Sequence, residues 1–197
     1  MTGSRPVVDY MFHDFALDAL GEIVNQIPKI QYMSSGRLKM PIVLRGCIGV
    51  GGAAATHHSG SYYPIFAHLP GFRVCLPSTP YDVKGLLKTA IRSDDPVIFM
   101  EHKSLLNARG HVPEEEYLIP FGTSNICREG NHITVVALTT MVQATLDVAS
   151  DLETEGISVE VIDPRTIAPL DIETILKSVN KTGRLLIADE TWAPCGI

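Results

Sequence analysis

The residues with the clearest chemical potential lie in the stretch RGCIGVGGAAATHHSGS, residues 45–61, directly after the apolar run PIVL. Gly49, Gly51 and Ala54 fit the pattern G-x-G-x-x-A, in which backbone amides approach a pyrophosphate at a helix N-terminus. His57 and His58 offer imidazoles, which exchange protons near neutral pH. The stretch therefore predicts either a phosphate-binding loop or a loop that presents a histidine.

The phosphate interpretation lacks its usual partner. A dinucleotide site also requires an acidic residue at the end of the next strand, about 20 residues further on. Residues 66–76 contain none, and PIVLRG is not the first strand that the sequence predicts. We interpret the glycines as an irregular loop, and a dinucleotide-binding module, testable by an NAD-induced shift in melting temperature, stays a minor alternative.

The histidines have a structural alternative as well, in which one caps a helix and the other is solvated. Because ligands of parallel α/β sheets bind at the carboxyl ends of strands, and this patch follows such an end, a proton-transfer role is open. The remaining histidines have no partners in the pattern, and we expect structural roles for His13, His68, His102, His111 and His132.

Strands and helices alternate around these residues. Apolar runs predict strands at 5–11, 41–45, 72–77, 96–101, 132–138, 157–163 and 184–190. Helical spacing predicts helices at 12–27, 62–70, 79–95, 140–156 and 170–183, with 30–33 as a short strand or loop. Continuous apolar strands between helices are typical of a parallel sheet covered on both faces, and the polar stretch 103–117 separates two such units.

Composition excludes several classes of protein. The chain has 197 residues, 45% hydrophobic, with a net charge of −6, so we expect a globular protein that binds no nucleic acid. No apolar stretch reaches the length of a membrane span, and the first residues do not resemble a signal peptide. The four cysteines are widely and irregularly spaced and lack metal-ligand spacing, so no zinc site is expected. The composition suits a reducing cytoplasm, and a mitochondrial matrix protein would look the same.

Six segments, taken in order, resemble one family. They are RPVVDYMFHDFALDA, YMSSG, MPIVLRG, THHSGS, LPSTPYDVKGLLKTAIRSDDPVIFMEHKSL and VIDPRTIAPLDIETILKSVNKTGRLLIADE. No single segment is diagnostic, but the ordered set covers nearly the whole chain. It is similar to the beta subunit of the thiamine-diphosphate-dependent 2-oxo acid dehydrogenases, the decarboxylating component of the pyruvate, branched-chain and acetoin dehydrogenase complexes.

The resemblance implies an α/β fold in two parts. Residues 1–105 are expected to form an incomplete, parallel-sheet pyrimidine-binding domain of the transketolase-like type. Residues 106–125 then form a linker, and residues 126–197 form an incomplete transketolase C-terminal-like domain.

The resemblance also implies roles for individual residues. His58 matches the family's active-site histidine, which lies near the thiazolium and assists proton handling and transfer to the lipoyl group. Phe15 matches an aromatic residue that packs on the aminopyrimidine, and Tyr32 matches a tyrosine of the cofactor pocket. A structural potassium ion, held through backbone carbonyls in some members, is expected near Ile42, Ala90, Ile91, Ser93 and Asp95.

The same resemblance implies partners and limits. An alpha subunit would hold the diphosphate and its magnesium, a lipoyl acyltransferase would accept the acyl group, and a homo-oligomer is expected. Family members also carry an upstream segment with the glutamate that activates the aminopyrimidine, and a stretch beyond TWAPCGI. We expect this chain to lack both and to be inactive alone, and the alternative is an inert α/β interaction or structural module derived from the family.

Overall fold

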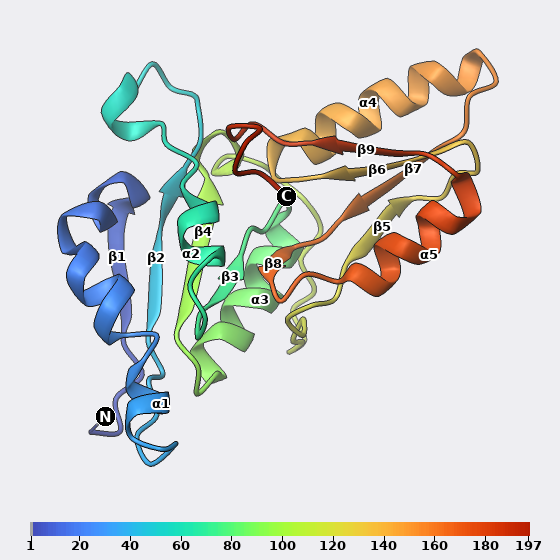
Figure 1. Ribbon diagram of the computed structural model, residues 1–197. Helices are drawn as coiled ribbons and strands as arrows, with labels where there is room; N and C mark the ends of the chain where they lie inside the picture. Colours follow the sequence, from blue (N-terminus) through green and yellow to red (C-terminus); the bar gives the residue numbers. More distant parts are fainter. Residues whose placement is uncertain (1) are drawn as a thin grey trace.

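The computed structural model describes residues 2–197, which form two α/β units (Figure 1). The first unit carries four parallel strands, short helical segments on one face and α3 on the other. In chain order its elements are β1 (Val7–Phe12), η1 (His13–Ala19), η2 (Glu22–Gln26), α1 (Ile30–Met33), β2 (Val43–Ile48), η3 (Thr56–His58), α2 (Tyr63–Ala67), β3 (Arg73–Cys75), α3 (Pro80–Arg92), β4 (Val97–His102) and η4 (Lys103–Leu105).

The second unit follows the irregular stretch after η4 and has its own sheet. Its elements are β5 (Asn125–Arg128), β6 (Ile133–Ala137), α4 (Thr140–Thr154), β7 (Val159–Asp163), β8 (Thr166–Ala168), α5 (Ile172–Thr182) and β9 (Leu185–Ala188). The strand order is β5-β7-β6-β9, with β6, β7 and β9 parallel and β5 antiparallel to β7. Helices α4 and α5 lie on opposite faces of this sheet (Figure 1).

The first sheet has the order β1-β2-β4-β3-β8. Its first four strands are parallel, as the apolar runs predict, but β8 pairs antiparallel with β3 through Val74↔Ala168 and Cys75↔Thr166. Each sheet is therefore mixed at one edge, which corrects the expectation of purely parallel sheets. The second unit thus contributes a strand to the first sheet.

Strand β4 corresponds to the apolar run predicted as a strand at 96–101, and its burial accounts for that run. All six of its residues are buried. Phe99 packs with Leu86 of α3 on one face, while Ile98 and Met100 pack with Phe66 of α2 on the other. A strand covered on both faces cannot alternate with polar residues, so Val97–Met100 are all apolar, and the polar Glu101 and His102 come only at its carboxyl end.

Helix α3 begins as its sequence predicts. The side chain of Thr79 accepts a hydrogen bond from the backbone N–H of Asp82 at 3.1 Å, and Pro80 occupies the first helical position. Such a cap satisfies one of the amide groups that a helix start leaves without a partner.

Two local predictions need correction. The segment predicted as one helix over 12–27 is helical but irregular, with 3₁₀ geometry in η1 and π geometry in η2. Residues 30–33, predicted as strand or loop, form the short helix α1, in which the N–H of Ser34 donates to the carbonyl of Ile30. Within residues 2–197, no helix combines the length and apolarity that crossing a bilayer requires.

Candidate functional site

Two loops at the carboxyl ends of neighbouring parallel strands bring three aromatic side chains together. Strand β1 ends at Phe12 and runs into η1, while β2 ends at Ile48 and continues into residues 49–61, here called the His58 loop. The His58 ring lies edge-on to Phe12, with 4.8 Å between ring centroids, and edge-on to Phe15 at 5.3 Å. The imidazole therefore has two phenylalanine rings beside it.

Backbone hydrogen bonds close the His58 loop at its base. The N–H of Gly49 donates to the carbonyl of Gly60 at 3.2 Å. The N–H of Gly60 in turn donates to Oδ1 of Asp14, in η1, at 3.1 Å. This second bond joins the His58 loop to the segment that carries Phe15 through the Asp14 side chain, so Phe15 and His58 lie on two segments that are bonded to each other.

Lys103, directly after β4, fixes the position of the histidine itself. Its Nζ donates to the carbonyl oxygen of His58 at 2.5 Å and to Oγ of Ser59 at 3.0 Å. The hydroxyl of Ser59 donates to the carbonyl of Ala55 at 2.6 Å, which closes the turn around η3. Sequence reasoning placed Lys103 at the start of a polar connection and missed this contact.

The exposed part of the site is an aromatic surface beside a proton-exchanging group. The Phe15 side chain is 42% exposed, which leaves part of its ring open for contact with a planar group. His58 is half-buried beside it. The arrangement can bind a flat heterocycle against Phe15 and transfer a proton to or from an atom near the imidazole.

Tyr32 does not join this group. It lies on α1 and is 90% exposed. The neighbouring Gln31 donates to the carbonyl of Asp94 and to Oδ1 of Asp95, just before β4 begins, whereas His58 is held by Lys103, just after β4 ends. Figure 1 likewise shows α1 beside the N-terminus, at the amino ends of β1 and β2. Phe15 and His58 are therefore together, and Tyr32 is at the other end of the sheet.

The residues predicted to hold potassium gather at that other end, where β2 and β4 begin and α3 finishes. The Arg5 guanidinium donates to the carbonyl of Ser93 at 2.7 Å and to that of Ile91 at 3.4 Å, and it contacts the Asp94 carboxylate at 2.6 Å. A side-chain cation thus uses two of the five predicted carbonyls.

The other three predicted potassium positions also have partners. The carbonyl of Ala90 accepts from the N–H of Ser93, and the carbonyl of Ile42 accepts from the N–H of Val97. The Asp95 side chain accepts two bonds from Arg73. Burial alone would raise the pKa of Asp95, but these bonds and one from Gln31 lower it. Among the described residues, no cluster of three or more His, Cys, Asp or Glu side chains is arranged to hold a metal ion.

A buried histidine and a half-buried glutamate link the two units behind the His58 loop. Nε2 of His102, at the end of β4, lies 2.8 Å from Oε1 of Glu190, which follows β9 of the second unit. The hydroxyl of Ser61 donates to the same oxygen at 2.9 Å. His102 was expected to be structural, and its position at a strand's carboxyl end was the signal that could have singled it out.

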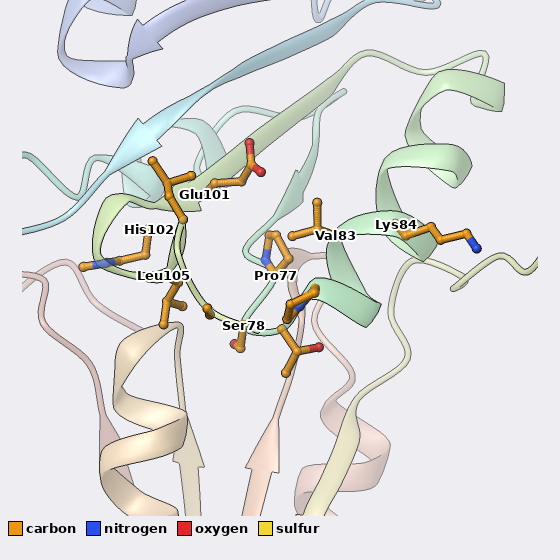
Figure 2. Close-up of a pocket in the computed structure, with 11 residues that line it drawn as sticks. Pro77, Ser78, Val83, Lys84, Glu101, His102 and Leu105 are labelled. Carbon is orange, nitrogen blue, oxygen red and sulfur yellow. The ribbon is translucent and has the colours of Figure 1, made fainter. Parts of the chain in front are cut away.

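A separate cavity of about 270 Å³ is lined by Glu101 and His102 of β4 and by residues 77–80, which follow β3. Figure 2 shows Glu101 and His102 leaving β4 in different directions, and Lys84 turned away from Glu101. Nε of Arg45 contacts the Glu101 carboxylate at 2.6 Å, and Lys84 donates to backbone carbonyls of residues 113–115. The charged groups around this cavity are therefore already paired, and its free lining is mainly apolar.

Comparison with known families assigns both halves of the chain. Residues 1–109 match the transketolase pyrimidine-binding domain, and residues 122–197 match the transketolase C-terminal domain. The chain therefore belongs to the transketolase pyrimidine-binding domain family, and the α/β fold class predicted from the sequence is confirmed.

Curated relatives confirm the resemblance to dehydrogenase beta subunits. The chain is 47% identical to the acetoin:2,6-dichlorophenolindophenol oxidoreductase subunit beta of Cupriavidus necator over 195 residues, 99% of this chain and 58% of that protein. It is 45% identical to the pyruvate dehydrogenase E1 component subunit beta of Rickettsia felis, over 99% of this chain and 60% of the relative. The chain thus spans about three-fifths of the length of these relatives.

A solved structure supports the fold. The protein titled "Split gene transketolase, inactive beta4 tetramer" superposes with a TM-score of 0.82 over 98% of this chain and 60% of its own. At 23% identity this similarity concerns the fold alone.

Proposed function

We propose that this chain supplies the beta-subunit share of a thiamine-diphosphate-dependent 2-oxo acid dehydrogenase. The observation that carries the proposal is the His58 ring beside Phe12 and Phe15, at the carboxyl ends of two adjacent parallel strands. The match to a pyrimidine-binding domain and the names of the relatives support the same assignment. In this proposal an alpha subunit completes the site, so the chain alone is inactive.

The residues present fit the pyrimidine half of the cofactor. Phe15 offers a partly open ring for a planar heterocycle, and Phe12 packs against the His58 ring. When bound, thiamine diphosphate supplies the carbon nucleophile and the electron sink that decarboxylation of a 2-oxo acid requires. This chain contributes the surface that orients the cofactor's ring and an imidazole that moves a proton.

His58 is the residue that moves the proton in the proposed reaction. The His58 and Phe15 rings are nearly perpendicular with 5.3 Å between their centroids, so a substrate bound beside Phe15 would lie close to the imidazole. Lys103 holds the His58 backbone and thereby limits movement of the ring during transfer. The acyl group would then pass to a lipoyl group of an acyltransferase partner, as the family resemblance implies.

Cofactor binding provides the first test. Thiamine diphosphate is titrated calorimetrically into the chain combined with an alpha subunit, using the parent chain, Phe15→Ala and Tyr32→Ala. Loss of the stacking ring in Phe15→Ala should weaken binding about ten-fold or more. Tyr32→Ala removes an aromatic side chain at the opposite end of the sheet and should bind as the parent does. Equal weakening by both changes would refute the location of the cofactor.

Turnover provides the second test. The same complex is assayed with pyruvate, 2-oxoisovalerate and acetoin, using 2,6-dichlorophenolindophenol as the electron acceptor. His58→Ala should lower turnover about 100-fold or more, because a positioned acid–base group contributes that much. The matched control is His57→Ala, an exposed neighbour in the same turn, which should stay within about two-fold of the parent. Absence of both cofactor binding and turnover in the parent complex would favour an inert interaction module.

A further inference from the structure

Both ends of the His58 loop contact residues at the ends of strands β4 and β9, which belong to different sheets. Glu190 and Thr191 follow β9 in the second unit, and both reach Ser61, the last residue of the loop. Oε1 of Glu190 accepts from the Ser61 hydroxyl at 2.9 Å, and the Thr191 hydroxyl donates to the Ser61 carbonyl at 3.0 Å. The end of the loop is therefore held by side chains of the second unit.

The first residue of the loop touches the same pair of side chains. A Cβ added to Gly49 would lie 1.9 Å from Nε2 of His102 and 2.6 Å from Oε1 of Glu190. Gly49 also has φ +89°, a conformation that residues with a Cβ rarely adopt. The bond between His102 and Glu190 thus lies directly against the backbone where the loop starts.

The hydrogen bonds of His102 show that Glu190 acts as a hydrogen-bond acceptor. The backbone N–H of Ser104 donates to Nδ1 of His102 at 3.2 Å, so Nδ1 is the acceptor and Nε2 carries the proton that Glu190 receives. Glu190 therefore accepts two hydrogen bonds at one oxygen. Burial would raise the pKa of Glu190, but donation by His102 and Ser61 lowers it.

His102 is also joined covalently to the residue that holds the catalytic imidazole. Lys103 follows it in the chain and donates to the carbonyl of His58. Any shift of the His102 backbone would move Lys103 and so loosen its bond to His58. Glu190 consequently contacts three points that determine where His58 lies: the start of the loop, its end, and His102, the residue directly before Lys103.

We propose that Glu190 is a positioning residue for His58, through which the second unit sets the geometry of the pyrimidine-binding site. Its role is that of a hydrogen-bond acceptor shared by His102 and Ser61. The effect on turnover rests on the function proposed above, whereas the effect on the loop does not. Three variants test the effect on the loop and the effect on turnover. Glu190→Ala removes the acceptor, Glu190→Gln keeps an acceptor oxygen, and Glu155→Ala is the control that removes an exposed acid of the same unit.

The first measurement is amide hydrogen exchange over residues 49–61, together with the nuclear Overhauser effect between the His58 and Phe15 rings. Glu190→Ala should speed exchange about ten-fold or more, because two hydrogen bonds to a charged group are lost, and should weaken the ring contact. Glu190→Gln and Glu155→Ala should stay within about three-fold of the parent. Unchanged exchange in Glu190→Ala, or equal effects in Glu190→Gln and Glu190→Ala, would overturn the proposal.

A further variant, Ser61→Ala, tests the proposal even if Glu190→Ala disturbs the second unit as a whole. Ser61→Ala removes one donor from outside that unit and should speed loop exchange while β6 and β7 stay protected. Exchange of the loop at the parent rate in Ser61→Ala would count against the proposal.

Turnover of the complex with an alpha subunit is measured last. Glu190→Ala should lower kcat more than it changes KM, with recovery in Glu190→Gln, because a misplaced His58 weakens the chemical step. If loop exchange responds as expected while even the parent shows no turnover, the proposed function fails and the positioning role stands. If the parent turns over and Glu190→Ala matches it in both turnover and exchange, the positioning role fails alone.

Discussion

Asp163, at the end of β7, carries the most perturbed carboxyl group at the junction of the two units. Its Oδ1 accepts from the backbone N–H of Arg165 at 2.8 Å, while its buried Oδ2 has no hydrogen-bond partner among residues 2–197. Burial, and then the nearby carboxylate of Asp82, raise the pKa of Asp163 to about 7, against the lowering effect of Ser78 and Arg165. Replacing the group by an amide, Asp163→Asn, removes this titration.

Protonation of Asp163 in the folded chain determines how the free energy of unfolding changes with pH. Between its ordinary pKa of 3.8 and about 7, Asp163 keeps a proton in the folded chain and loses it in the unfolded chain. The free energy of unfolding therefore falls as pH rises through this window and is constant above it. The shift corresponds to about 4 kcal/mol at most, so Asp163→Asn should gain stability relative to the parent by up to that amount between pH 4 and pH 8.

Urea unfolding followed by circular dichroism at pH 4.5, 6 and 8 measures this difference. The parent profile alone is not diagnostic, because burial lowers the pKa of His13 to about 4. A buried neutral histidine makes stability fall as pH drops from 6.5 towards 4, which opposes the effect of Asp163. The difference between Asp163→Asn and the parent isolates the aspartate. The control is Asp151→Asn, an exposed position on α4. A pH-independent difference for Asp163→Asn, equal to that of the control, would refute the reasoning.

Two further changes test packing and the cation at the amino end of the sheet. Gly85→Ala would bring a Cβ within 2.6 Å of Ile119, so it should destabilise by about 1–3 kcal/mol in urea unfolding although alanine favours helices. A stabilised variant would contradict the packing around α3. Arg5→Ala removes a guanidinium worth about 1 kcal/mol or less, so the melting temperature should fall by a few degrees and recover partly in KCl but not in NaCl. An equal response of the parent to KCl would contradict the view that Arg5 serves in place of potassium.

The sequence allowed much of the fold to be predicted where one element determines its own burial. Strand β4 and helix α3 are clear examples, because an uninterrupted apolar run and a Thr-Pro cap are local signals. The short edge strands β5 and β8 escaped prediction, since a strand of three or four residues is defined by its neighbour. Helix α1 was missed because none of its four residues is buried. Only its backbone hydrogen bonds define it as a helix, and the sequence does not display them.

The candidate site likewise has one part that the sequence predicts and one part that it does not. His58 stands out in the sequence because a polar pair after an apolar strand is visible in the linear chain. Glu190 and His102 are 88 residues apart and meet only because β4 and β9 end at the same place in space. Their contact depends on how the two sheets are set against one another, and a pattern read along one strand at a time contains no information on that.

Strand β8 has a consequence for how the molecule can be divided. It belongs to the second unit by its position in the chain but to the first sheet by its hydrogen bonds, and the N–H of Leu76 also bonds to the carbonyl of Arg165 beside it. Separating the halves would strip a strand from β3 and leave an open edge. A protease cut within residues 106–121 should therefore give two fragments that stay associated. The two family matches separate the chain between residues 109 and 122, whereas the hydrogen bonds between β3 and β8 join the two sides of that boundary.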